Sequence, residues 1–238
     1  SFMVAAQKSM LSDTLSHLAL VGVGLGVVLG ISPVVLSVVS TCLLSILLYF
    51  KQSKRGQNID GLNMVVLSGS LALTLVLVSL NPSNPIQLEN YLFGSILTIN
   101  NAEIQTYVWL NLLILILLCV RFKDLVTLVF DPEFLHVKGR YTLNKIIFLF
   151  CIGLLIATSL KVVGGLLIGG LLTISVLTAQ HSSQSFKQSI IRAIVYNIIG
   201  VALGLFASFY LNLPASSAII LVLISFFILS RIKKLLKV

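Results

Sequence analysis

The sequence predicts an all-α protein, a polytopic transmembrane helical bundle. Hydrophobic residues make up 58% of the 238 residues and charged residues only 10%, whereas a soluble domain carries about a quarter charged residues. The apolar runs are long and continuous rather than alternating, which favours helices over a membrane-spanning barrel. We therefore expect residues 1–238 to form a single transmembrane domain.

Eight apolar runs come close to the roughly 20 residues that a membrane-spanning helix needs. Helix breakers or polar loops separate neighbouring runs, and they define the boundaries of the expected helices. The predicted spans are residues 9–32, 34–50, 61–80, 105–121, 143–161, 164–180, 188–211 and 214–231.

The first four spans are separated by proline and by polar segments. The first follows Lys8 and ends near Pro33, after which the second begins. The polar segment 51–60 separates the second span from the third, and the NPSNP sequence at 81–85 ends the third. The fourth span ends before Arg121, the first charge of the next loop.

The last four spans have equally clear limits. The charged segment 122–142 precedes the fifth span, and the pair Gly164-Gly165 divides the fifth from the sixth. A polar turn at 181–187 separates the sixth from the seventh, and Pro214 begins the eighth.

The positions of the basic residues predict the orientation of the bundle. If the C-terminal sequence RIKKLLKV is cytoplasmic, all of the 16 Lys and Arg residues except Lys161 lie at or near the cytoplasmic face. Both ends of the chain are then cytoplasmic in a multi-pass protein of the cell membrane. The net charge of +9 is therefore interpreted as a topology signal. No basic patch interleaved with aromatic residues indicates a nucleic-acid partner.

Two long loops differ in character. The outer loop, 81–104, carries no basic residue, and its apolar YLFGSIL sequence predicts a short interfacial or re-entrant helix. Glu103 is expected to cap or begin the fourth span, and a role in metal entry at the outer side is the alternative. The inner loop, 122–142, mixes charged and apolar residues, which predicts a short amphipathic helix along the membrane that could dock to a cytoplasmic partner.

Asp13 and His17 are the candidate metal ligands. They stand at i and i+4, on one face of the first predicted span. Measured from Lys8, Asp13 lies ~7 Å and His17 ~13 Å along the helix, so His17 approaches the middle of the bilayer. Carboxylate and neutral imidazole together suit zinc or manganese. Protonation of His17 would remove a ligand, so acid is expected to weaken binding.

The same two residues have a structural explanation, which the sequence leaves open. Asp13 could be a helix N-cap aided by Ser12, and His17 could hydrogen-bond a neighbouring helix. A bound metal ion also needs more than the two ligands that Asp13 and His17 would provide. A second copy of the chain or water on the substrate could supply the others.

Glycines at four-residue spacing predict close helix packing. Gly22, Gly26 and Gly30 repeat within the first span, and Gly165/Gly169 and Gly200/Gly204 repeat the spacing later. In lipid, such small-residue faces bring helices together. We therefore expect the helix with Asp13 and His17 to pack among other helices.

The remaining polar groups have simpler explanations. Asp131, Glu133 and His136 are expected to form a solvated charge cluster, and His181 a solvent-facing residue of a turn. The three cysteines show no C-x-x-C spacing and are interpreted as small buried hydrophobes: Cys42, Cys119 and Cys151. No phosphate-binding G-x-x-x-x-G-K-[ST] sequence or nucleophile–base set is found, so uphill transport would need another subunit or an ion gradient.

Four segments together resemble the permease subunits of bacterial ABC importers for zinc, manganese or iron. They occur in the expected order and cover essentially the whole chain, and the element SDTLSH is the most specific. The segments are KSMLSDTLSHLALVGVGLG (8–26), YLFGSILTI (91–99), VFDPEFLHVKG (129–139) and VVGGLLIGGLLTISVLTAQ (162–180).

The resemblance implies a function and a set of partners. It implies two cytoplasmic ATPase subunits, an external metal-binding protein and a homodimeric or paired permease, in which a second permease copy gives a homodimer. Asp13 and His17 would lie on the metal pathway, with the divalent metal as transported substrate and no permanently bound cofactor. Asp131, Glu133 and Gly139 would engage the ATPase, so that the segment near 122–142 couples ATP hydrolysis to transport. A further helix would precede residue 1.

Two other functions remain as alternatives. In a proton-coupled secondary transporter, Asp13 and His17 would form a proton relay. In a non-transporting membrane scaffold, the SDTLSH sequence would be a helix cap and its histidine a packing residue. Uptake that needs no ATPase and follows the proton gradient would indicate the first, and normal assembly without metal-dependent activity the second.

Overall fold

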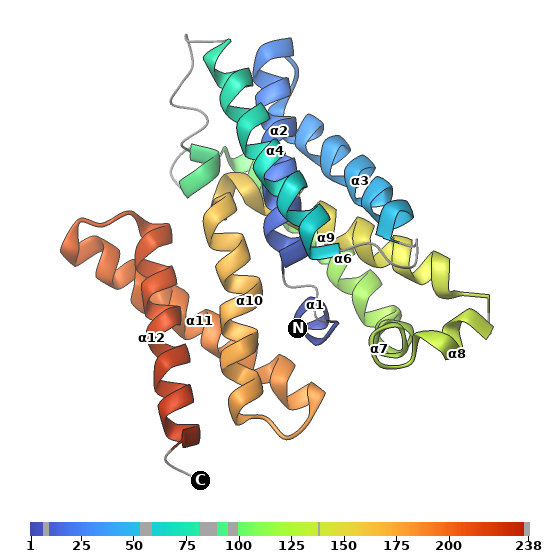
Figure 1. The fold of residues 1–238 in the computed structure, drawn as a ribbon. Helices are drawn as coiled ribbons and strands as arrows, with labels where there is room; N and C mark the ends of the chain where they lie inside the picture. Colours follow the sequence, from blue (N-terminus) through green and yellow to red (C-terminus); the bar gives the residue numbers. More distant parts are fainter. Residues whose placement is uncertain (7–9, 53–58, 81–89, 95–99, 138, 236–238) are drawn as a thin grey trace.

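The computed structural model agrees with the predicted all-α class (Figure 1). It describes residues 1–6, 10–52, 59–80, 90–94, 100–137 and 139–235, and no strand occurs within these ranges. A single helical turn at 90–93 lies between α4 and α6. The other helices are α1 (Phe2–Ala5), α2 (Met10–Leu29), α3 (Pro33–Gln52), α4 (Ile59–Ser79), α6 (Asn101–Val120), α7 (Phe122–Phe130), α8 (Pro132–Val137), α9 (Tyr141–Val163), α10 (Gly165–Ser182), α11 (Phe186–Leu211) and α12 (Ala215–Leu235).

A helix lies at each of the eight predicted spans, with ends displaced by a few residues. Within the described ranges, six helices are long and apolar enough to cross a membrane: α2, α4, α9, α10, α11 and α12. The apolar stretches described in α3 and α6, Pro33–Leu47 and Ile104–Val120, are shorter. The structure therefore supports a multi-pass membrane protein, and the count of eight spans stays a prediction.

Helix α2 lies at the centre of the bundle. It packs against α3, α4, α9 and α10, and 72% of its membrane-length stretch is buried, compared with 17% for α4 and for α11. The main apolar core forms around it, where Leu15, Leu20, Ile156 and Leu160 are fully buried. The prediction that the helix carrying Asp13 and His17 packs among protein helices is confirmed.

Helix α10 connects this core to a second group of helices. It packs against α2 and α9 on one side and against α11 and α12 on the other. A smaller apolar cluster of Leu167, Ile219 and Leu223 joins α10 to α12. In Figure 1, α11 and α12 lie beside α10 and away from α3 and α4.

Glycines mark two of the close helix contacts, as their spacing predicts. A Cβ added at Gly22 would lie 2.5 Å from the Leu36 carbonyl oxygen of α3, and one at Gly204 would lie 2.5 Å from Ile219 Cα of α12. Gly30 differs from the prediction. It follows the end of α2 with a φ of +68° and nothing near its Cβ position, so it ends the helix rather than packing it.

The predicted amphipathic helix in segment 122–142 is divided into α7 and α8. The division falls at Asp131, which has φ −143° and ψ 71°, because the proline that follows disfavours helical backbone before it. Leu125 and Leu135 are buried at 1% and 2% exposure, whereas Phe130 is 61% exposed. Among the described side chains, each short helix therefore has a leucine buried in the protein, Leu125 in α7 and Leu135 in α8.

The predicted helix in the outer loop is present as the turn at 90–93. Tyr91 is buried in the main core, and Gly94 lies against the junction of α9 and α10. There the backbone of Gly94 approaches Gly164 so closely that a Cβ on Gly94 would be 2.6 Å from the Val163 carbonyl oxygen. Both glycines have positive φ, which favours glycine. Residues 95–99 of the predicted helix lie outside the described ranges.

Candidate functional site

The SDTLSH sequence lies in the first two turns of α2. The helix begins at Met10, so Asp13 lies inside its first turn and is not the residue that precedes the helix, as the N-cap alternative requires. Ser12, Thr14 and Ser16 are all buried at 1% exposure or less. The hydroxyl of Thr14 donates to the Met10 carbonyl at 3.0 Å, and that of Ser16 donates to the Ser12 carbonyl at 2.9 Å. These two hydroxyls are therefore satisfied within their own helix.

The carboxylate of Asp13 lies against Gly169 of α10. A Cβ added at Gly169 would be 3.1 Å from Asp13 Cγ and would collide with the Oδ1 atom. The absent side chain thus makes the space that the carboxylate occupies. The sequence pattern singled out Gly169 for helix packing only, because nothing in the spacing of glycines shows which side chain faces them.

His17 lies one turn further along the same face of α2. Its side chain is half-buried, and its Nδ1 atom is buried without a hydrogen-bond partner in the described part of the chain. An unpaired polar nitrogen away from water is unfavourable, and an ion or a proton donor would satisfy it. The structural alternative, in which His17 hydrogen-bonds a neighbouring helix, finds no support at Nδ1 among the described residues.

Among the described His, Cys, Asp and Glu side chains, Asp13 and His17 form a pair that no third such side chain joins. No group of three or more His, Cys, Asp or Glu side chains that could hold a metal occurs among the described residues. A transported ion would therefore need ligands from other oxygen atoms, from water or from a partner.

The second set of predicted residues lies at α8, apart from Asp13 and His17. Asp131 precedes α8, and its Oδ1 accepts a hydrogen bond from the Phe134 backbone N–H at 3.2 Å, which is the N-cap interaction. Glu133 is exposed in the first turn of this helix. Gly139 has a φ of +65° and open space at its Cβ position. The side chain of His136 lies outside the described set.

Contacts with α9 hold α7 in place. Arg121, between α6 and α7, donates from Nη1 to Asn144 Oδ1 at 3.2 Å and lies 3.5 Å from the Asp124 carboxylate. The Phe2 ring contacts three other aromatic rings, with centroid distances of 5.2 to 6.2 Å. These rings belong to α7, α9 and α11: Phe122, Phe148 and Phe186.

Three further predictions have different outcomes. His181 is half-buried rather than solvent-facing, and its ring lies 5.3 Å from the ring of Phe227 in α12, because α12 covers the end of α10 that sequence alone treated as an open turn. Glu103 lies in the first turn of α6, and its side chain is outside the described set. Two of the cysteines are buried as expected, whereas Cys119 is exposed.

Sequence and structure comparisons place the chain among metal transport proteins. The chain is 31% identical to the high-affinity zinc uptake system membrane protein ZnuB of Haemophilus influenzae, over 98% of this chain and 90% of ZnuB. It is 28% identical to the manganese import system permease protein ScaB of Streptococcus parasanguinis, over 98% of this chain and 85% of ScaB.

The fold has a solved counterpart. The structure of PsaBC from Streptococcus pneumoniae in complex with Fab matches 96% of this chain and 83% of the compared chain, with a TM-score of 0.80 and 26% identity. The family profile of the ABC 3 transport family matches residues 1–234. Because this match extends over nearly the whole sequence, the chain belongs to the ABC 3 transport family.

Proposed function

We propose that this chain is the membrane-spanning permease subunit of an ATP-driven importer for divalent metal ions, with zinc, manganese or iron as the transported ion. The relatives named as zinc and manganese transport proteins support this class of substrate. The observation that carries the proposal is the Asp13/His17 pair on the buried face of α2. The Asp13 carboxylate lies against Gly169, and the His17 Nδ1 atom has no hydrogen-bond partner among the described residues.

In this proposal the pair is the point at which the ion is dehydrated inside the bundle. An ionisable group within a membrane is costly unless it faces a partner or a polar pathway, and a passing cation pairs with the carboxylate and accepts the imidazole lone pair. The remaining coordination positions are filled by water or by groups that the pair does not include.

The proposed topology has eight spans, with α3 and α6 crossing the membrane beside the six longer helices. It places the C-terminus in the cytoplasm and α7–α8 on the same side. The basic residues support this orientation, since Lys161 alone of the 16 Lys and Arg residues lies at the outer side.

We further propose that α7 and α8 are the coupling segment. Asp131, Glu133 and Gly139 would face a cytoplasmic ATPase subunit, on which ATP is hydrolysed, and the exposed rings of Phe130 and Phe134 support a docking role. An external metal-binding protein would deliver the ion. A second permease copy would complete the transporter as a homodimer, with each chain forming a single transmembrane domain.

Metal uptake by the reconstituted complex tests the site. Asp13→Asn and His17→Ala variants that still assemble with the ATPase should lose at least about 90% of ATP-dependent uptake, because the first removes the negative charge that attracts the cation and the second removes the imidazole ligand. Normal uptake in both variants would show that the pair has no role in transport. Uptake that persists without the ATPase and follows a proton gradient would instead indicate a secondary transporter.

A further inference from the structure

Asn63 is a buried polar residue in the otherwise apolar helix α4. It is 3% exposed, and its Oδ1 atom is buried without a hydrogen-bond partner in the described part of the chain. The buried hydroxyls of the same helix are different, because Ser70 donates to the Leu67 carbonyl at 2.8 Å and Thr74 to the Ser70 carbonyl at 2.7 Å. Asn63 therefore presents an oxygen that no described protein group satisfies.

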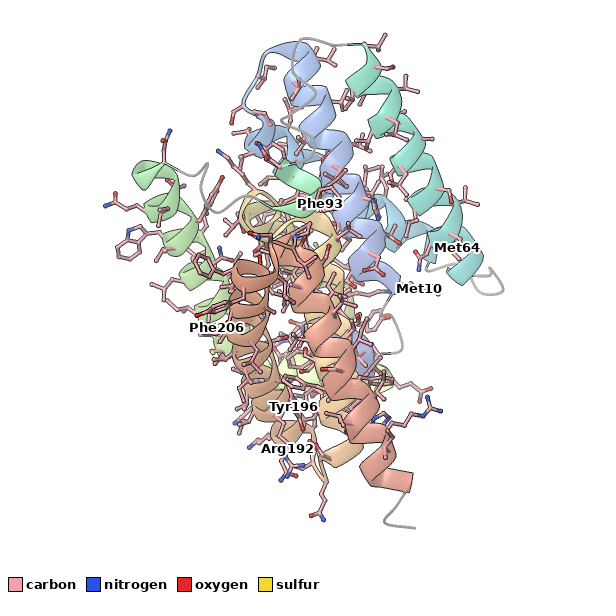
Figure 2. The ribbon with its side chains drawn as sticks, turned by 90° about the vertical axis from the view of Figure 1, so that its left-hand side faces the viewer. Met10, Met64, Phe93, Arg192, Tyr196 and Phe206 are labelled. Atoms are coloured by element: carbon pink, nitrogen blue, oxygen red, sulfur yellow. The ribbon has the colours of Figure 1, made fainter. Side chains whose placement is uncertain are left out.

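Helix α2 covers Asn63. Among the described helices, α2 is the one against which α4 packs extensively, and the two lie side by side in both views (Figures 1 and 2). The neighbouring residues Met64 and Val65 are 54% and 73% exposed, so they lie on the opposite side of α4. The amide of Asn63 therefore belongs to the α2–α4 interface.

The helix register places Asn63 close to the start of α2. A Cβ on Gly24 of α2 would lie 3.2 Å from Leu77 Cβ of α4, and the helices run in the same direction. Counting back two heptads along both helices brings Asn63 to the level of Met10, since residues seven apart share a face. Figure 2 agrees, because Met10 and Met64 mark the same ends of α2 and α4.

The same face of α2 carries the metal ligands. Residues 10, 13, 17 and 24 lie at spacings of three, four and seven, which place them on one side of a helix. Asp13 is one turn above Met10, at ~1.5 Å per residue. The Asn63 amide is thus on the side of Asp13 that faces away from His17, at the end of α2 where the chain enters the bundle.

We propose that Asn63 supplies a cation-coordinating oxygen next to the Asp13/His17 pair, on the side nearer the start of α2. This inference rests on the proposed function. Amide oxygens coordinate hard divalent ions. Together with a carboxylate, such an oxygen suits Mn²⁺ better than Zn²⁺, which prefers softer ligands. Asn63 then does two things: it extends the polar path from the pair toward the cytoplasmic end and it raises the affinity for Mn²⁺.

The test measures Mn²⁺ and Zn²⁺ binding to the assembled permease–ATPase complex in lipid nanodiscs, by competition with a fluorescent chelator. Asn63→Leu, which removes the oxygen at similar size, should weaken Mn²⁺ binding by about tenfold and Zn²⁺ binding less. Asn63→Asp, which keeps an oxygen at the same place, should retain Mn²⁺ binding. Thr74→Val is the matched control, because its hydroxyl is satisfied within α4.

Unchanged Mn²⁺ binding in Asn63→Leu overturns the inference, as does an equal loss in Thr74→Val. If Asn63→Leu does not assemble, Asn63→Ala removes the same oxygen without adding volume and is judged by the same result. Asp13→Ala in the same assay separates the two proposals, because it removes both carboxylate oxygens. Metal binding that survives Asp13→Ala contradicts the proposed site itself, whereas loss there with normal binding in Asn63→Leu contradicts only the role of Asn63.

Discussion

At the scale of single residues, the geometry of the site depends on a missing side chain. Asp13 occupies space that any residue larger than glycine at position 169 would fill. Two helices therefore determine the position of the pair, although both proposed ligands belong to α2. A substitution in α10, which itself offers no ligand, should disturb it.

Gly169→Ala should move the Asp13 carboxylate and weaken metal binding by about tenfold, because misplacing a ligand of a metal site typically costs 10–100-fold in affinity. Titration of the assembled complex with Zn²⁺ or Mn²⁺ measures the change. Gly69→Ala in α4 is the control, since nothing lies within 4 Å of a Cβ at that position. Equal affinities in the two variants would show that the contact with Gly169 does not position the carboxylate.

At the scale of elements, α9 connects the proposed coupling segment to the site. It contacts α7 and α8 at one end and packs against α2, α3 and α10 along its length. The hydrogen bond from Arg121 to Asn144 fastens the start of α7 to this helix. Asn144 is 1% exposed, so its amide is held by packing and offers a rigid anchor for the partly exposed arginine.

Asn144→Leu should reduce ATP-driven uptake several-fold while metal binding stays unchanged, because α7 loses its polar attachment to α9 and Arg121 loses its acceptor. Asn144→Asp keeps an acceptor for the arginine and should restore uptake. The control is Asn111→Leu in α6, where the amide donates only to its own helix, to the Tyr107 carbonyl at 2.8 Å. The prediction is wrong if Asn144→Leu lowers binding and uptake equally.

At the scale of the whole molecule, the bundle has a buried central helix and a peripheral pair, α11 and α12. Only 17% of the membrane-length stretch of α11 and 22% of that of α12 are buried. Large apolar side chains therefore cover the outside, among them Phe206 at 64% exposure and Phe209 at 78%. Such a surface is stable only in contact with lipid or another apolar surface.

The orientation of the whole bundle can be tested with single cysteines in a chain whose three natural cysteines are replaced. Gln184→Cys, in the exposed turn between α10 and α11, should react with a membrane-impermeant maleimide only from the cytoplasmic side. Leu213→Cys, in the turn between α11 and α12, should react only from the outside, because α11 crosses the membrane between them. Labelling of both from one side would contradict the proposed topology.

The sequence by itself determined the class of the protein and the places of its helices. Composition excludes a soluble domain, and uninterrupted apolar runs form helices because backbone groups in lipid must be paired within the segment. Asp13 and His17 also follow from the sequence as neighbours, since residues four apart share a helical face. Pro132 divides segment 122–142 by a local steric effect. This signal is present in the sequence, although a single helix was predicted there.

Only the tertiary structure decided which helices meet around that pair. Gly169 is distant in sequence from Asp13, and Asn63 lies on a helix whose apolar pattern does not show which side faces α2. The burial of His181 under α12 likewise depends on a contact between separate helices. In lipid, hydrophobicity does not distinguish a helix face that meets protein from one that meets acyl chains. Shape complementarity between particular residues makes that choice, and it exists only once the helices are packed.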